Sequence, residues 1–251
     1  MAFKIFQEYK EKHAQKLRHK YNLDHIKVVG FDVDRTLMQS NENKSIYTLI
    51  EENSGHYELF QQLGEKYKNL ELNQSIVESW GAESLELYKK VGIDKDRIQD
   101  FTIKYMYPAP GAKKVIKKLH KMNIKVAVIS GGLKNSFEVF AEQNKLNIDY
   151  LYITNEFIFD KNGKVKDIKA NNYNFKGKLK AMEEINKIEG ISFENTAFIG
   201  DGENDIDLLK AVKIGIAYNT ENEKVIKNAN IILKDMDMKK LFKELKEYKR
   251  S

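Results

Sequence analysis

The sequence lacks cysteine and long apolar runs, and each absence excludes a class of protein. With no cysteine in 251 residues, there is no disulfide framework, no thiol nucleophile and no cysteine-ligated zinc or iron–sulfur site. No run approaches the roughly 20 apolar residues of a membrane helix, and the opening MAFKIFQEYKEKHAQ is too charged for a secretory signal. We therefore expect a cytoplasmic protein without membrane contact, in which any metal is held by oxygen or histidine.

The net charge of +6 does not indicate a nucleic-acid partner, because it is confined to the two ends of the chain. Residues 1–24 carry six Lys/Arg against three Asp/Glu, and residues 234–251 carry seven against four. A nucleic-acid surface would interleave basic and aromatic side chains along a groove. We expect two basic helical ends on the surface. For the N-terminal one, a helical extension over 1–24, homodimerisation is the alternative role.

Short apolar segments alternate with helical segments along most of the chain. Segments nearly continuous in Val, Ile, Phe and Ala are typical of strands covered on both faces. Helical segments between them indicate βαβ units, so we predict an α/β fold with a doubly wound, Rossmann-like parallel sheet. The predicted strands are 27–32, 125–130, 150–155, 196–201, 214–217 and 230–233, and the predicted helices include 3–21, 112–122, 177–188 and 205–212.

A long insertion separates the first predicted strand from the second. Residues 39–107 predict several helices. This insertion separates 25–38 from 108–251, the two parts of the α/β domain. Its balance of twelve acidic against eight basic residues argues against a polyanionic substrate. We expect its aromatic residues to form mostly a bundle core, with an apolar or cationic alcohol as substrate if some line the pocket. The predicted helices of the insertion are 45–52, 56–68, 74–88 and 94–105.

Acidic side chains follow two of the predicted strands. Asp32 ends the first predicted strand and Asp34 lies two residues beyond it, whereas Asp201 ends the fourth and Asp205 lies four residues beyond it. Because ligands gather at the carboxyl ends of strands in such sheets, we expect the four carboxylates to lie together. They would repel one another in a partly dry cleft unless a cation joined them. Oxygen-only ligands with room for water favour Mg²⁺.

A predicted phosphate cradle accompanies these carboxylates. Ser130, followed by Gly131 and Gly132, offers a hydroxyl and unhindered backbone N–H groups at a helix start. Lys178 opens the helix before the fourth strand and is placed to neutralise an anion, with Lys176 as the alternative. Mg²⁺, a cradle and a lysine together indicate phosphoryl transfer.

In this arrangement the chain resembles the haloacid dehalogenase superfamily. That superfamily carries DxDxT, then Ser or Thr, then Lys, then a DGxND-type motif, and the sequence has DVDRT, SGG, Lys178 and DGEND in that order. The segment 153–165, which reads as a hairpin turning at Asn162-Gly163, makes it similar to the phosphoserine phosphatase-like branch. So do the run KIEGISFENTAFIGDGENDIDLLK and the later KIGIAYN. The resemblance covers about 26–235 and omits the N-terminal helix. It implies that residues 39–107 are an inserted α-helical cap on a catalytic core formed by 25–38 and 108–251, and that this cap excludes water and contacts the substrate.

The resemblance implies catalytic roles for the carboxylates. Asp32 would attack phosphorus and form an aspartyl-phosphate. Asp34 would protonate the leaving alcohol and then deprotonate the attacking water. Asp201, Asp32 and the backbone carbonyl of Asp34 would hold Mg²⁺, with Asp205 supporting this metal site. A purely structural alternative is an aspartate that ends a strand or, for Asp205, caps a helix.

The same resemblance implies roles in binding the substrate. Thr36 would orient the loop that follows the nucleophile. Ser130, the Gly131 amide and Lys178 would hold the phosphoryl oxygens, and Asn204 would face the substrate. The alternative for Ser130 is a cap on the next helix.

The second aspartate favours one reaction within the superfamily. Release of an alcohol from phosphate needs a general acid such as Asp34, so we predict hydrolysis of a small-molecule phosphate monoester. Phosphoserine phosphatases clamp their substrate with an acidic residue after the first motif and a cap arginine. Here Glu42 is the acidic candidate, but Val77 stands where the arginine is expected, so we predict another ester. The alternatives are phosphoserine phosphatase proper, a phosphotransferase or phosphomutase, and a catalytically idle binding module.

Overall fold

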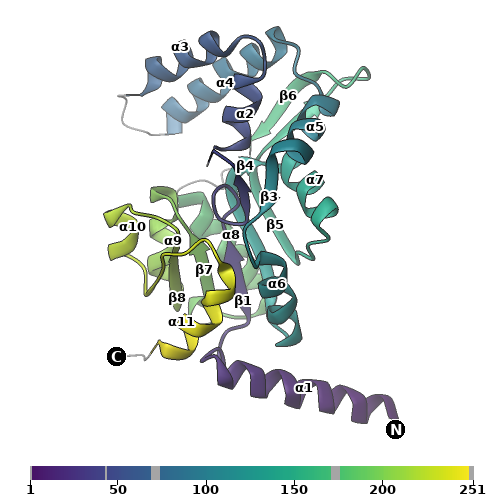
Figure 1. Cartoon of the computed structure of the whole chain (residues 1–251), viewed down its shortest axis with the longest axis vertical. Helices are drawn as coiled ribbons and strands as arrows, with labels where there is room; N and C mark the ends of the chain where they lie inside the picture. The colour runs from purple at the N-terminus through teal and green to yellow at the C-terminus, as the bar shows by residue number, and fades with distance from the viewer. Residues whose placement is uncertain (1, 43, 69–73, 171–175, 249–251) are drawn as a thin grey trace.

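A seven-stranded sheet forms the centre of the protein. The computed structural model describes residues 2–42, 44–68, 74–170 and 176–248, without the side chains of 2–5, 74, 75, 77 and 78 (Figure 1). The strands of the sheet are β1 (Val28–Phe31), β4 (Lys125–Leu133), β5 (Tyr150–Phe159), β6 (Val165–Ala170), β7 (Thr196–Gly200), β8 (Ile214–Tyr218) and β9 (Ile231–Leu233). Their order is β6-β5-β4-β1-β7-β8-β9, and every neighbouring pair is parallel except β5 and β6.

The central position of β1 creates the point at which ligands bind in such sheets. Val28 of β1 pairs with Lys125 of β4 on one side and with Thr196 of β7 on the other. The chain therefore leaves β1 in one direction toward β4 and later returns in the other direction to β7. The carboxyl ends of these three strands face the crevice of a topological switch point.

Helices cover both faces of the sheet, as the near-continuous apolar strands predict (Figure 1). One face packs against α6, α7 and α11, with Phe31, Phe137 and Phe140 fully buried between them. The other face packs against α8, α9 and α10 through residues that include Met182 and Leu208. The predicted doubly wound α/β class is confirmed. The bounds are α6 (Ala112–Lys121), α7 (Lys134–Asn144), α8 (Lys176–Glu189), α9 (Ile206–Ala211), α10 (Glu223–Lys227) and α11 (Leu241–Glu247).

Four helices occupy the predicted insertion. They are α2 (Ile46–Glu52), α3 (Tyr57–Tyr67), α4 (Gln74–Lys90) and α5 (Lys95–Tyr105). A two-stranded antiparallel sheet of β2 (Met38–Ser40) and β3 (Met106–Pro108), absent from our prediction, joins the segments that enter and leave these helices. Buried residues of the insertion, such as Ile46 and Tyr88, belong to the same hydrophobic cluster as one face of the large sheet. The division into core and cap stays a prediction, because this shared cluster joins the two.

The hairpin of β5 and β6 contacts the insertion at the start of α5. It turns at Asn162 and Gly163, as predicted, with Gly163 in the left-handed conformation that suits glycine (φ +77°). The Gly163 carbonyl accepts a hydrogen bond from the Lys95 amide (2.9 Å), and Lys164 Nζ lies 2.9 Å from Asp94 Oδ2. These contacts fix the hairpin tip to the start of α5.

The N-terminal helix α1 (Ala2–Lys20) projects from the rest of the protein (Figure 1). Its C-terminal part is attached through buried Ala14 and through Arg18, whose Nη1 donates to the Met122 carbonyl at 2.6 Å. Phe6 and Tyr9, farther out, are 52% and 69% exposed. The helix is therefore confirmed, whereas homodimerisation through it stays a prediction. Within the described ranges, no helix has the length and apolar character needed to cross a membrane.

Candidate active site

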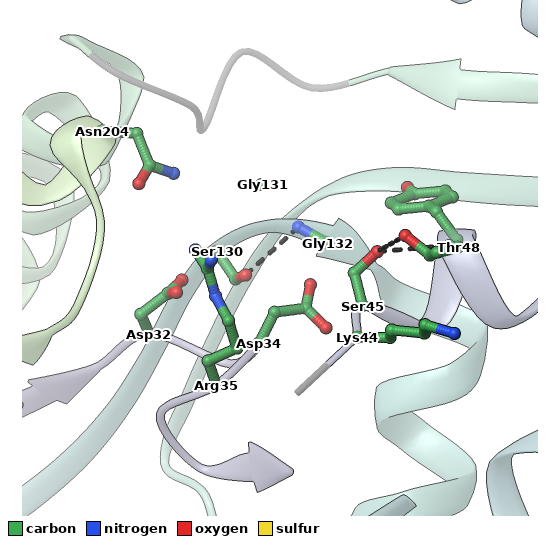
Figure 2. A pocket seen from close by; sticks show the side chains of 11 residues that line it. Asp32, Asp34, Arg35, Lys44, Ser45, Thr48, Ser130, Gly131, Gly132 and Asn204 are labelled. Atoms are coloured by element: carbon green, nitrogen blue, oxygen red, sulfur yellow. Dashed lines mark hydrogen bonds between the residues drawn. The ribbon is translucent and has the colours of Figure 1, made fainter. Parts of the chain in front are cut away.

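The motif residues meet in a cavity of about 430 Å³ at the carboxyl ends of β1 and β4 (Figure 2). Asp32 directly follows β1, and Asp34 lies on the loop beyond it. Ser130 and the two glycines after it come from β4, and Asn204 approaches from the segment after β7 (Figure 2). Segments more than 170 positions apart in the sequence thus contribute to one cavity.

The start of α2 supplies another wall of this cavity: Lys44, Ser45, Tyr47 and Thr48. The Tyr47 hydroxyl accepts a hydrogen bond from Asn155 Nδ2 at 2.8 Å. Other aromatic residues of the insertion, such as Phe60 and Tyr88, are buried in the core as expected. The wall from α2 is missing from our sequence prediction, because helical periodicity does not tell which turn of a helix meets a remote loop.

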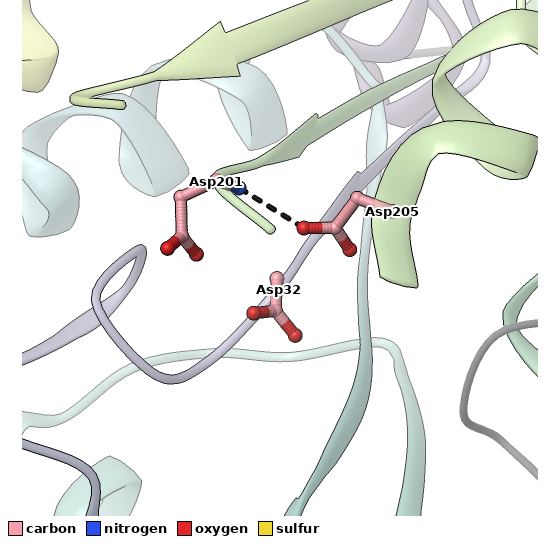
Figure 3. Close-up of side chains that lie close together, drawn as sticks. All are labelled: Asp32, Asp201 and Asp205. Atoms are coloured by element: carbon pink, nitrogen blue, oxygen red, sulfur yellow. Dashed lines mark hydrogen bonds between the residues drawn. The ribbon is translucent and has the colours of Figure 1, made fainter. Parts of the chain in front are cut away.

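Three buried carboxylates form a compact cluster beside the cavity (Figure 3). One oxygen each from Asp32, Asp201 and Asp205 lies within 4.8 Å of the others. The donor set is oxygen only, as Mg²⁺ prefers. The side chain of Asp34 stands outside this group, and its predicted contribution was the backbone carbonyl.

Lys178 balances part of the negative charge of the cluster. Its side chain is fully buried, and Nζ donates to Asp32 Oδ1 at 2.7 Å and to Asp205 Oδ1 at 2.6 Å. Burial opposes the charge of Lys178, but the nearby charges of Asp205 and Asp32 outweigh this effect and raise its pKa. Lys176, the alternative, is exposed. The structure therefore brings Lys178 to the candidate nucleophile.

Asp205 is held by donors on both of its carboxylate oxygens. Oδ1 faces Lys178, and Oδ2 accepts from the backbone amides of Asp201 (3.0 Å) and Gly202 (2.9 Å). Asp205 stands at the N-cap position of α9, but its side chain makes no capping hydrogen bond to that helix. Through the Gly202 amide it closes the start of the preceding 3-10 helix Glu203–Asp205, so the capping alternative holds for that turn and not for α9. The contacts suit a residue that positions Lys178 and the loop containing Asp201.

Asp201 is also contacted on both oxygens, by residues of the loop after β1. The hydroxyl of fully buried Thr36 donates to Oδ1 at 3.1 Å, and Arg35 Nε lies 3.0 Å from Oδ2. Thr36, which we grouped with the substrate-binding residues, thus orients a carboxylate of the cluster. Arg35 has no role in our sequence prediction. The one signal in the sequence for such a role was the positive charge of Arg35 at the second variable position of the DxDxT motif.

Asp34 lines the cavity, and the pKa of its carboxyl lies in a range that suits proton transfer. Its Oδ1 is buried, and the described part of the chain offers this atom no hydrogen-bond partner. Burial and then the charge of Asp32 raise the pKa of Asp34 to about 6, although the Ile46 amide and Arg35 act in the opposite direction. A carboxyl with such a pKa can both give and take a proton near neutral pH.

The candidate phosphate cradle has a different local structure from the one we predicted. Strand β4 continues through Ser130 to Leu133, with a register shift against β5, and α7 begins only at Lys134. The cradle is therefore an irregular strand end and not a helix start. Ser130 Oγ accepts from the Gly132 amide at 3.1 Å, so this contact lies within the cradle and does not cap α7.

We expect Asp201→Asn to raise thermal stability in metal-free buffer above pH 7. Burial and then the charge of Asp32 raise the pKa of Asp201 to about 7. A carboxyl whose pKa is higher in the folded than in the unfolded state lowers the stability of the fold when it is ionised. This loss of stability is complete above the folded-state pKa and becomes smaller as the pH falls toward about 4, the unfolded-state pKa. We expect the variant to melt about 4 °C higher at pH 8.

Melting curves from pH 4 to pH 8 in EDTA measure this effect. The difference should shrink toward pH 4, where the wild-type carboxyl is protonated. Added Mg²⁺ should stabilise the wild type more than the variant. Equal melting temperatures at every pH would contradict the assignment of a destabilising charge to Asp201.

Comparisons with known proteins agree with this geometry. A family model described as haloacid dehalogenase-like hydrolase matches residues 26–213. A phosphoserine phosphatase of Methanocaldococcus jannaschii is 30% identical over 224 residues, which cover 88% of this chain and 98% of that protein. A solved phospho-aspartyl intermediate analogue of phosphoserine phosphatase has a TM-score of 0.69 at 26% identity, with 87% of this chain and 98% of that chain covered. A substrate-bound phosphoserine phosphatase complex has the same TM-score and identity, with 87% and 97% covered.

These matches span both the sheet and the helical insertion, so the likeness is not confined to the short motifs. The matched family segment contains Asp32, Ser130, Lys178 and Asp201, the residues that the fold brings together. The chain belongs to the haloacid dehalogenase-like hydrolases and is similar to their phosphoserine phosphatases.

Proposed function

We propose that this chain is a Mg²⁺-dependent phosphatase of the phosphoserine phosphatase type. It would hydrolyse a small phosphate monoester through an aspartyl-phosphate on Asp32. The observation that carries the proposal is the meeting of Asp32, Asp34 and the Ser130 cradle in one cavity, beside a buried carboxylate cluster. A binding module without catalytic activity would have no chemical need for both aspartates in this geometry.

The donor set fits a divalent cation. Among the described residues, the three clustered carboxylates are paired with two cationic side chains, Lys178 and Arg35, which leaves an excess of negative charge in a buried place. Asp32 and Asp201 would hold the ion, and Asp205 would keep the surrounding loop in position. When bound, Mg²⁺ would neutralise charge on the phosphoryl group and on the facing carboxylates.

The side chains of the cavity can carry out both halves of the reaction. A carboxylate oxygen of Asp32 forms a bond to phosphorus while the bond to the ester oxygen breaks, and protonated Asp34 gives its proton to the departing alcohol. Asp34 then takes a proton from water as that water attacks phosphorus and releases Asp32. The Ser130 hydroxyl and the Gly131 amide would hold the phosphoryl oxygens, Lys178 would keep Asp32 oriented, and Asn204 would face the substrate.

The relatives favour phosphoserine over the other ester that our sequence analysis predicted. Relatives that match this chain over nearly their whole length include phosphoserine phosphatases. The side chain of Val77, on which our objection rested, lies outside the described residues. Glu42 is paired with Lys44, which itself lines the cavity. The relatives therefore support phosphoserine phosphatase proper, the alternative to our main prediction, better than another phosphate ester.

A panel of phosphate monoesters tests the proposal. Phosphate release from phosphoserine, phosphoethanolamine and p-nitrophenyl phosphate is measured with Mg²⁺ and with EDTA. We expect turnover only with Mg²⁺ and at least about a tenfold preference in kcat/KM for phosphoserine over phosphoethanolamine, because a charged contact to the carboxylate is lost in the second ester.

Other outcomes would point to the competing functions. Phosphate transfer to added alcohols in place of release would indicate a phosphotransferase or phosphomutase. No turnover of any ester would indicate a binding module. Equal rates on phosphoserine and phosphoethanolamine would keep the phosphatase but remove the substrate assignment.

A further inference from the structure

Arg35 lies where two cavities meet. It lines the cavity of about 430 Å³ that contains Asp32 and Asp34, and also a second cavity of about 740 Å³ next to it. The second cavity is bounded by Asp201, Glu203 and Lys234, among others. The Arg35 side chain is 49% exposed, so its guanidinium combines contact with a buried carboxylate and access to both spaces.

The backbone at Arg35 is held in an unfavourable conformation. Its φ is +60°, in the left-handed region where side chains other than glycine are disfavoured. Two hydrogen bonds fix it there: the Arg35 amide donates to the Met38 carbonyl (2.9 Å), and Gln39 Nε2 donates to the Arg35 carbonyl (2.5 Å). Glycine would fit this turn without strain, so an arginine here points to a use for the side chain.

The contact of Arg35 places it in competition with a metal ion. Arg35 Nε faces Oδ2 of Asp201, while Thr36 donates to Oδ1. A divalent cation held by Asp201 needs one of these oxygens. Thr36 is fully buried and neutral, whereas Arg35 is charged and half-exposed, so Arg35 is the partner that can leave. Repulsion between the two cations favours its departure.

We infer that Arg35 is an exchangeable counter-ion of Asp201, which neutralises this carboxylate without metal, gives it up to Mg²⁺ and then binds the phosphoryl group in the cavity beside Asp34. The inference rests on the Mg²⁺ site of the proposed function. The planar guanidinium carries several N–H donors and suits the oxygens of a phosphate dianion. Metal binding would thereby prepare the site for its anionic substrate.

Mg²⁺ titration by calorimetry tests the first half of the exchange. It is done at pH 9, where protons compete least for the carboxylates. We expect Arg35→Gln and Arg35→Gly to bind Mg²⁺ about tenfold more tightly than the wild type, because a cation near the site has been removed. Glycine also relieves the backbone, so it provides a folded variant if glutamine does not. Unchanged or weaker Mg²⁺ binding in the folded variants would overturn the inference.

Two matched variants separate charge competition from other effects. Arg35→Lys keeps the charge and should bind Mg²⁺ within about threefold of the wild type. Lys234→Gln removes one positive charge from the wall of the second cavity, and among the described residues the ion pair of Asp201 is with Arg35 and not with Lys234, so this variant should also leave Mg²⁺ affinity within that range. An equal gain in Lys234→Gln would show a general charge effect and would count against exchange at Asp201.

Inorganic phosphate is the probe for the second half. With saturating Mg²⁺, phosphorus NMR titration should show at least about fivefold weaker phosphate binding in Arg35→Gln, because a charge-assisted contact to the anion is lost, whereas in EDTA the two proteins should differ less. Equal phosphate affinity with Mg²⁺ would overturn the second half. Wild type that binds no Mg²⁺ would instead remove the proposed metal site itself, whereas Mg²⁺ binding without a gain in Arg35→Gln removes this inference alone.

Discussion

Asp32→Asn should lose at least about 10³-fold of its Mg²⁺-dependent phosphate release, because an amide cannot serve as the nucleophile. The substitution keeps the shape of the side chain and an oxygen that can accept from Lys178, which lies 2.7 Å from Asp32 Oδ1. The fold should therefore remain. Release of phosphate from phosphoserine and p-nitrophenyl phosphate measures the loss, and circular dichroism checks the fold.

A matched control is available six residues beyond Asp201. Asp207 is an exposed acidic residue in the first turn of α9, so Asp207→Asn changes the same charge without touching the carboxylate cluster. This variant should keep wild-type activity within about twofold, as is usual for a surface substitution. Activity of Asp32→Asn within tenfold of the wild type would rule out Asp32 as the nucleophile.

Asp34→Asn should lose activity to an extent that depends on the leaving group. An alkyl alcohol such as that of phosphoserine needs a proton as it departs, so we expect a loss of at least about 10³-fold with this ester. p-Nitrophenolate leaves without a proton, so its release in the first step should fall far less. Because Asp34 is also the proposed base of the second step, p-nitrophenol should appear as a burst of about one equivalent per enzyme, followed by slow turnover.

Rapid-mixing measurements of p-nitrophenolate absorbance, at about 405 nm, separate the two steps, because a covalent intermediate that accumulates gives a burst of product before the slower turnover. Asp32→Asn provides the comparison, since it should show neither burst nor turnover. The raised pKa of Asp34, about 6, agrees with a residue that alternates between acid and base. An equal fractional loss with both esters, without a burst, would contradict the role of Asp34 in proton transfer.

Periodicity predicted the large elements well, because they depend on long apolar patterns. The six strands predicted from apolar runs are all present, with ends shifted by a few residues. The hairpin turn at Asn162-Gly163 followed from local backbone preference alone. The three-residue strands β2 and β3 escaped prediction, because so short a segment carries no periodic signal and pairs only when the insertion brings its ends together.

The candidate site divides in a similar way. Asp32, Asp34, Ser130 and Asp201 were predicted from their positions at the ends of strands, because the carboxyl ends of parallel strands share one edge of a sheet. The helix-start cradle was wrong, since β4 continues to Leu133. The roles of the site residues stay predictions until the substitutions above are measured.

The sequence by itself determined the α/β class, the order of the strand-end motifs and the chemical types available at the site, because these depend on local pattern and residue identity. Only the tertiary structure decided which of these groups touch: that Lys178 joins Asp32 to Asp205, that Thr36 and Arg35 share Asp201, and that α2 walls the cavity. Such contacts depend on how remote segments pack around the switch point. The periodicity of the sequence does not indicate which side chains of two remote segments come into contact.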